Sequence, residues 1–158
     1  MEIRRATRAD VPAVVDLIRL LAEFERLPPP DDGAGDRLAR DAFDCDPARV
    51  ELWVADDDDG RVVAYAACFA SYSTFGARPS LFLEDLFVHP AARRKGIARR
   101  LLAHLRDEAE RRGCGRFEWM VLGWNQDAIA LYRAIGAELQ ADWQLYRIDL
   151  TGRSRPPP

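Results

Sequence analysis

The feature that most constrains the fold is an apolar segment, SLFLEDLFV at 80–88, which is followed closely by a helical pattern. Ile97, Leu101, Leu102 and Leu105 recur at helical spacing, which predicts an amphipathic helix over 96–112. A further strand pattern, RFEWMVL at 116–122, comes after that helix. Strand, helix and strand in this order predict a sheet with helices packed on it.

The remaining periodicities extend this arrangement to one mixed α/β (α+β) domain over 1–150. Helices are expected at 7–27, 37–43, 96–112 and 125–137, with strands at Ile3, 50–55, 61–73, 80–88, 116–122 and 143–150. Asn125 is a plausible N-cap and Gly136 a helix stop. Pro28–Asp36 is expected to be a loop, and the tail 151–158 is expected to be disordered.

Five basic residues surround the glycine between strand and helix, where the helix dipole disfavours positive charge. They are Arg93, Arg94, Lys95, Arg99 and Arg100, and the glycine is Gly96. One interpretation is a solvated basic turn. The other is a phosphate cradle, because free amides at a helix start favour an anion and a glycine lets a ligand approach the backbone. The motifs GxxxxGK[ST] and GxGxxG are absent, so nucleoside triphosphates and dinucleotides are not the first candidates.

Two adjacent carboxylates lie within the apolar strand. Glu84 and Asp85 are expected to point to opposite faces, so that at least one has apolar neighbours and a raised pKa. Such a group is either a structural carboxylate or a general base tuned towards neutral pH.

A second candidate for proton transfer is Tyr132, on the helix that follows the 116–122 strand. By spacing alone it is most often a core or half-buried residue. A phenol has a pKa near 10, which suits donation of a proton to a thiolate leaving group. His89 and His104 have no metal-ligand spacing, and the DDDDG turn lacks the pattern of a calcium loop, so no metal site is predicted.

The overall charge and the cysteines limit the class of protein. A net charge of −3 and a pI near 5.4 argue against general nucleic-acid binding, so that any anion site must be local. Three cysteines without a CxxC pair argue against a disulfide framework or a zinc site and favour a reducing cytoplasm. No signal peptide or membrane span is expected from the sequence.

Taken together, these segments resemble the GCN5-related N-acetyltransferases (GNAT). RRKGIA is similar to the family's acetyl-CoA pyrophosphate motif [Q/R]-x-x-G-x-[G/A], with Arg93, Gly96 and Ala98 at the specified positions. The match extends from Ile3 to Asp149 and is closest to the spermidine/spermine (diamine and thialysine) acetyltransferase branch. It rests on LAEFERL, YSTF, FLEDLFV, RRKGIARRLL, GWNQDAIALYRAIGA and WQLYRIDL. The resemblance implies a central sheet of about six to seven strands flanked by about four helices.

The resemblance also implies roles for individual residues. The pyrophosphate contacts are Arg93, Arg94, Lys95, Gly96, Ile97, Ala98 and Arg99. Leu86, Phe87 and Val88 would pair with the pantetheine arm near a bulge, and Asn125 and Ala128 would make a second coenzyme contact. Tyr132 would protonate the coenzyme A thiolate, and Glu84 would receive the proton of the amine. The implied substrate contacts are Phe24, Glu25, Glu84 and Trp119, with Asp142 as a further acidic contact that is either retained or lost.

The implied activity is direct, acetyl-CoA-dependent acetylation of a primary amine in a ternary complex, without a metal. The implied acceptor is a small polyamine, diamine or lysine-like amino acid, and the implied enzyme is a cytoplasmic homodimer without nucleic-acid or membrane partners. The open alternatives are another acceptor (a protein amino group or an aminoglycoside), and a non-catalytic module that binds coenzyme A or nucleic acid.

Overall fold

The computed structural model describes residues 1–150, so the expected disorder of 151–158 lies outside the described residues. The chain divides into two compact units, Met1–Met120 and Val121–Pro158. The first unit contains the whole sheet and the glycine turn, and the second contains Tyr132.

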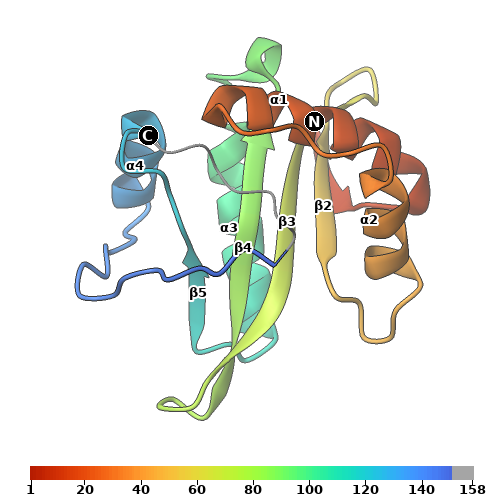
Figure 1. The fold of residues 1–158 in the computed structure, drawn as a ribbon. Helices are drawn as coiled ribbons and strands as arrows, with labels where there is room; N and C mark the ends of the chain where they lie inside the picture. The colour runs from red at the N-terminus through yellow and green to blue at the C-terminus, as the bar shows by residue number, and fades with distance from the viewer. Residues whose placement is uncertain (151–158) are drawn as a thin grey trace. The chain divides into compact units, whose positions relative to one another are not determined.

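Five strands form the sheet of the first unit, in the spatial order β1-β2-β3-β4-β5 (Figure 1). In chain order the unit consists of β1 (Glu2–Arg5), η1 (Arg8–Asp10), α1 (Val11–Glu25), α2 (Ala34–Phe43), β2 (Glu51–Asp56), β3 (Val62–Ser73), β4 (Arg78–Val88), η2 (Pro90–Ala92), α3 (Ile97–Arg111) and β5 (Arg116–Trp119). The first four strands pair antiparallel, while β4 and β5 pair parallel. A parallel pair needs a long crossover connection, which α3 supplies. The predicted mixed α/β class is therefore confirmed.

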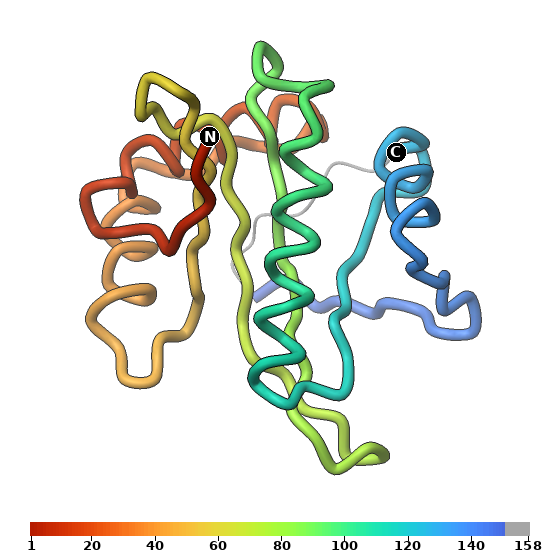
Figure 2. The backbone as a smooth tube through the Cα atoms, turned by 180° about the vertical axis from the view of Figure 1, so that it is seen from behind, coloured from red at the N-terminus to blue at the C-terminus, as the bar shows by residue number. Residues whose placement is uncertain are grey.

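Helices cover both faces of this sheet. α1 and α2 lie on one face and α3 on the other (Figures 1 and 2). The first face is closed by a core in which Val14 and Leu17 of α1 pack with Tyr65 and Phe87. The opposite face is closed by a core in which residues of α3 pack with Ala64 and Val88. Successive strand residues thus serve different cores, as the period of two requires, and the turn between β4 and α3 is fixed from both sides.

The described part of the second unit, residues 121–150, contains one helix, α4 (Gln126–Ala134). The side chain of Asn125 accepts a hydrogen bond from the Ala128 amide (3.3 Å), which confirms the predicted N-cap. Gly136 follows the helix with φ +86°, a conformation that glycine adopts readily.

One predicted strand is wrong: residues 143–150 form no strand, and the described residues contain five strands instead of six to seven. Their apolar side chains are 64–91 % exposed at Trp143, Leu145, Tyr146, Ile148 and Leu150. A strand is defined by hydrogen bonds to a neighbouring strand, and periodicity in one segment carries no information about that neighbour. Smaller differences are that α2 begins at Ala34, within the expected loop, and that β5 ends at Trp119.

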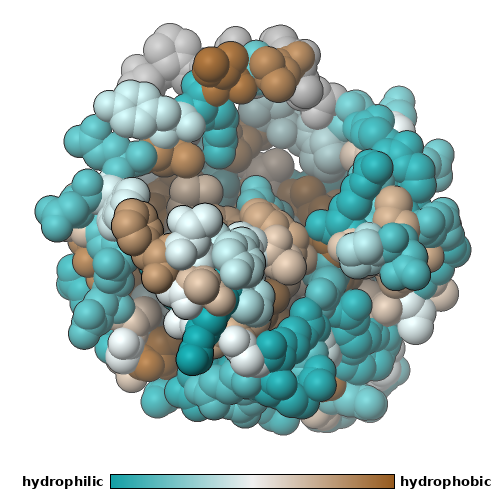
Figure 3. All heavy atoms as spheres, turned by 90° about the horizontal axis from the view of Figure 1, so that it is seen from below, coloured by the Kyte–Doolittle hydropathy of each residue, from teal (hydrophilic) through white to brown (hydrophobic). Residues whose placement is uncertain are grey.

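The surface in Figure 3 is mostly hydrophilic, with apolar side chains in scattered groups. This agrees with a chain in which 31% of the residues are charged. Among residues 1–150, none of the helices combines the length and the apolar composition needed to cross a bilayer.

Candidate active site

The turn between β4 and α3 has the backbone geometry of an anion site. Gly96 is the N-cap of α3, with φ +75°, and Arg94 two residues earlier has φ +64°. A Cβ added at Gly96 would meet nothing within 4 Å, so the glycine is required by its conformation and not by crowding. The first helical bond is donated by the Arg100 amide to the Gly96 carbonyl (3.0 Å). The amides from Ile97 to Arg99 therefore have no acceptor inside the helix and are available to an anion.

The basic side chains of this turn suit the same anion. Arg94, Lys95, Arg99 and Arg100 are all exposed, so their charge adds to that of the helix N-terminus. Arg93 is different, because its guanidinium contacts other parts of the first unit.

The edge of β4 that precedes the turn is open on one side. β5 pairs with β4 only from Ser80 to Leu83, so within residues 1–150 the β4 backbone beyond Leu83 has no partner strand on the β5 side. The side chains of Phe87 and Val88 are buried, whereas that of Leu86 is half-buried. The fold thus leaves the backbone of 86–88 able to pair with an extended ligand while its side chains hold the sheet together.

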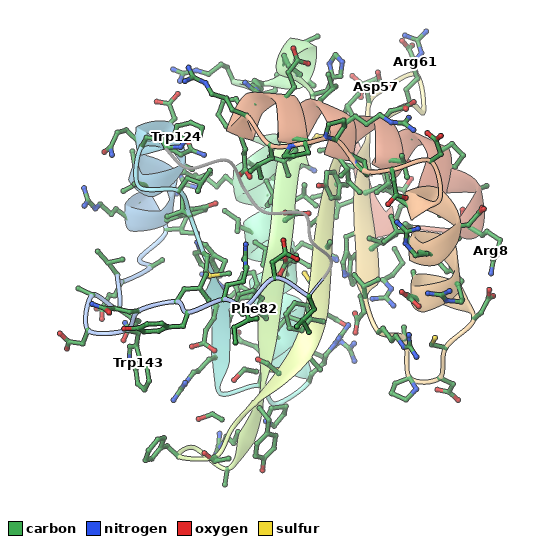
Figure 4. All side chains as sticks on the ribbon, viewed as in Figure 1. Arg8, Asp57, Arg61, Phe82, Trp124 and Trp143 are labelled. Carbon is green, nitrogen blue, oxygen red and sulfur yellow. The ribbon has the colours of Figure 1, made fainter. Side chains whose placement is uncertain are left out.

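A β-bulge at Glu84 changes the arrangement of the two adjacent carboxylates. Along β3, Ala67 and Cys68 are consecutive, but their β4 partners are Asp85 and Leu83, so Glu84 is an extra residue. Phe82, labelled in Figure 4, pairs with Phe69, which lies on the same face of β3 as Ala67. The ring centroids of Phe69 and Phe82 are 5.0 Å apart.

The bulge shows that the expected face assignment is wrong. Phe82 and Asp85 share one face although they are three residues apart, and simple alternation would place them on opposite faces. Glu84 is the inserted residue, so alternation no longer separates it from Asp85. The charge of Glu84 accordingly raises the pKa of Asp85.

The carboxylate with the strongly shifted pKa is Asp85. Its pKa is raised to about 6, mainly by burial and then by the charge of Glu84, with a smaller effect of Glu25, while a hydrogen bond from Tyr65 opposes the shift. The Tyr65 hydroxyl donates this bond to Asp85 Oδ2 (3.2 Å). Burial, followed by the charge of Asp85, raises the pKa of Tyr65 well above its ordinary value, so Tyr65 remains a neutral donor. Glu84 is exposed.

This shift predicts that Asp85→Asn stabilises the protein at neutral pH. A carboxyl group with a raised pKa is ionised at a cost in the folded state above pH 6, and the cost fades as pH falls towards the unfolded pKa of 3.8. The shift corresponds to at most about 3 kcal/mol, and asparagine can still accept the Tyr65 hydrogen bond. Urea unfolding should show that Asp85→Asn raises the free energy of unfolding at pH 7.5, and that this increase is smaller at pH 4.5.

The matched control is Asp16→Asn. Asp16 is an exposed carboxylate on α1, paired with Arg19 (2.7 Å), and its removal should change the free energy of unfolding by no more than about 0.5 kcal/mol. A gain for Asp85→Asn that is equal at both pH values would contradict the assigned pKa.

The end of α1 lies against this part of β4. Phe24, at 40 % exposure, and Glu25, which is half-buried, are the last two residues of the helix. Glu25 acts electrostatically on both Asp85 and Tyr65. Three carboxylates, Glu25, Glu84 and Asp85, therefore act electrostatically on the Tyr65 hydroxyl, and their combined negative charge favours a cation.

The other predicted site residues belong to β5 and to the second unit. Trp119 is half-buried on β5, with its ring 4.9 Å from that of Phe117. Tyr132 is half-buried on α4 in the second unit, and Asp142 is exposed beyond that helix. Within residues 1–150, no group of three or more histidine, cysteine, aspartate or glutamate side chains could hold a metal ion.

Sequence reasoning missed Tyr65 and did not choose Asp85 as the perturbed carboxylate. Asp85 was one of two candidates, and an unrecognised bulge kept it from being distinguished. Tyr65 lies in the middle of an apolar strand and has no sequence signal, because its hydrogen bond spans 20 residues along the chain.

Comparisons with known proteins agree with this geometry. Residues 15–137 match the family described as "Acetyltransferase (GNAT) family". Thialysine N-epsilon-acetyltransferase of Mus musculus is 32% identical over 142 residues, covering 86% of this chain and 83% of that protein. L-ornithine N5-acetyltransferase of Arabidopsis thaliana is 29% identical over 189 residues, covering 92% of this chain and 83% of that protein. A solved structure of a probable acetyltransferase superposes with a TM-score of 0.82 at 20% identity, covering 96% of this chain and 99% of that one.

Proposed function

Since this chain belongs to the acetyltransferase (GNAT) family and is an N-acetyltransferase, we propose that its acceptor is the primary amine of a small polyamine, diamine or lysine-like amino acid. The observation that carries this proposal is the negative charge beside Tyr65, where Asp85 accepts the Tyr65 hydrogen bond and the charges of Glu25 and Glu84 act on both groups. A cationic amine would relieve the mutual repulsion of these groups. The names of the thialysine and L-ornithine acetyltransferase relatives support an acceptor of this class.

Acetyl-CoA, the acetyl donor of the family, fits the turn between β4 and α3. We propose that the amides and basic side chains of 93–99 hold its pyrophosphate and that the open β4 edge at 86–88 pairs with its pantetheine arm. Asn125 and Ala128 would provide a second contact in the second unit. The supporting observations are the φ of +75° at Gly96, the free amides at the start of α3 and the unpaired β4 backbone.

In the proposed reaction, two side chains move protons while the acetyl group passes directly to the amine. Glu84 takes a proton from the ammonium group, through water, because only the neutral amine is a nucleophile. The amine nitrogen forms a bond to the thioester carbonyl carbon, and the carbon–sulfur bond breaks. Tyr132 gives its proton to the leaving sulfur and recovers one from solvent. The amide nitrogen loses its second proton to solvent, and Glu84 releases the proton that it took. Holding both substrates in line supplies a further part of the rate, without a covalent enzyme intermediate.

Glu25 is proposed to hold the distal end of the acceptor, with Phe24 beside it. Glu25→Gln should raise KM for cationic amines by roughly five- to tenfold and lower kcat less, because the lost contact is equal in the bound ground state and the transition state. Steady-state rates over a series of diamines of increasing length would measure this split.

Glu110→Gln is the matched control for Glu25. Glu110 is an exposed carboxylate of α3, paired with Arg106 (3.7 Å), so that its loss changes net charge equally and should leave the amine KM within about twofold. Equal amine KM values for Glu25→Gln and the parent protein would show that the acceptor does not reach Glu25.

The decisive experiment is a panel of amines with acetyl-CoA, in which thiol release is followed. We expect the fastest turnover with polyamines, diamines or lysine-like amino acids. A preference for a protein amino group or an aminoglycoside would contradict the proposed acceptor class. Thermal stabilisation by coenzyme A tests binding to the folded state separately. A salt-dependent shift on DNA or RNA, with no protection by coenzyme A, would instead indicate a nucleic-acid-binding module.

The cellular location and the oligomeric state are also proposed. The cysteines Cys45, Cys68 and Cys114 are all free thiols, which is compatible with a reducing cytoplasm. A homodimer is proposed from the resemblance to the diamine acetyltransferase branch, and sedimentation velocity would test it.

A further inference from the structure

The guanidinium of Arg93 is engaged by protein groups on three sides. Its Cζ lies 5.2 Å from the ring centroid of Phe24 and 5.2 Å from that of Phe87. Its Nε–H donates a hydrogen bond to the Val88 carbonyl (3.1 Å). Both ring distances are within the range of cation–π attraction, which a planar guanidinium makes particularly well.

These contacts join three segments that are far apart in the chain. Phe24 belongs to the end of α1, Phe87 to the end of β4, and Arg93 to the turn that opens α3. The other cations of the turn differ, since no cation–π contact joins Arg94, Lys95 or Arg99 to an aromatic ring among the described residues.

A pocket of about 330 Å³ lies at this junction. It is lined by Leu20, Glu23, Phe24, Phe87, Pro90 and Arg93. Since Phe24 and Glu25 are consecutive at the end of α1, a displacement of this helix end would move both the Phe24 ring and the carboxylate that acts on Asp85.

We propose that the Arg93 side chain is a positioning residue for the amine acceptor, clamping the end of α1 against β4 through Phe24 and Phe87, and is not a ligand of the coenzyme pyrophosphate. The inference deepens the proposed function and rests on it. The Arg93 backbone remains among the proposed pyrophosphate contacts, whereas its side chain sets where Phe24 and Glu25 meet the acceptor.

The test separates the kinetic parameters of the two substrates in Arg93→Lys and Arg93→Met. Lysine keeps the charge but loses the planar group and the Nε–H, while methionine keeps length and loses charge. Both variants should raise the amine KM, by roughly five- to thirtyfold for methionine and less for lysine, from the loss of two cation–π contacts. The dissociation constant for coenzyme A, measured by calorimetry, should stay within about twofold.

Arg94→Met serves as the comparison within the same turn. Its exposed side chain should act on the coenzyme, so that this variant weakens coenzyme A binding more than it raises the amine KM. A double-mutant cycle of Arg93→Lys with Phe24→Leu should be non-additive in amine KM, since both changes break one contact. Melting temperatures would verify that each variant is folded.

Two results would overturn the inference. One is weaker coenzyme A binding in the Arg93 variants with an unchanged amine KM, which would make the side chain a phosphate ligand. The other is additivity of Arg93→Lys and Phe24→Leu. Failure of the proposed function is a different observation, namely a parent protein that neither binds coenzyme A nor acetylates any amine of the panel.

Discussion

Tyr132→Phe should lower kcat by about 10²–10⁴, the range typical of a lost general acid, and leave both KM values within about twofold. The expected cause is loss of the one proton that the phenol gives to the leaving thiolate, since phenylalanine preserves the ring and its packing. Tyr132 lies in the last turn of α4, so this change should not disturb the N-cap at Asn125. The rate of thiol release and the rate of amide formation, measured in the same reaction, should fall together.

Tyr146→Phe is the matched control for this prediction. Tyr146 is 86 % exposed and follows α4 in the same unit, with its hydroxyl hydrogen-bonded to Gln144 (3.3 Å). The kcat of the Tyr146→Phe variant should equal that of the parent protein. If Tyr132→Phe releases thiol at the parent rate, Tyr132 is not the acid.

The two adjacent carboxylates should respond differently to substitution. Glu84→Gln should lower kcat by roughly 10²–10⁴ at every pH, because it removes the proposed base. Asp85→Asn should instead remove the rise near pH 6 from the pH profile of kcat/KM. In the parent protein, kcat/KM for a cationic amine should rise through pH 6 as Asp85 ionises and attracts the ammonium group.

The two substitutions are also coupled in a direction that can be checked. Glu84 raises the pKa of Asp85, so Glu84→Gln should move the remaining step to a lower pH. Profiles of kcat/KM from pH 5 to 9 for both single variants would measure this. A large loss of kcat in Asp85→Asn, together with a nearly unchanged Glu84→Gln, would assign the base to Asp85.

Much of the first unit could be predicted because its elements carry strong local signals. The apolar β4 pattern, the glycine turn and the stripe of α3 are each complete within a short window. In the second unit, the Asn125 cap likewise needs only its own helix. The strand expected at 143–150 is wrong for the opposite reason, since a strand depends on a partner that the segment does not contain.

The candidate site also has one part that could be predicted and one part that could not. The motif at 93–99 locates the proposed coenzyme turn, because an anion site at a helix N-terminus is made mostly of consecutive amides. The relation of Glu84 to Asp85 could not be predicted, since a bulge is a mismatch between two strands and does not exist in either one alone.

By itself, the sequence determined where the proposed coenzyme turn lies and which residue types are available for proton transfer. Local conformation and helix capping depend on neighbours along the chain, and these the sequence displays directly. Only the tertiary structure decided that Asp85 is the desolvated carboxylate, that Tyr65 donates to it, and that Arg93 contacts Phe24 instead of projecting with its neighbours. Burial and through-space contacts between distant segments set these properties, and they arise only when β3, β4 and α1 pack together.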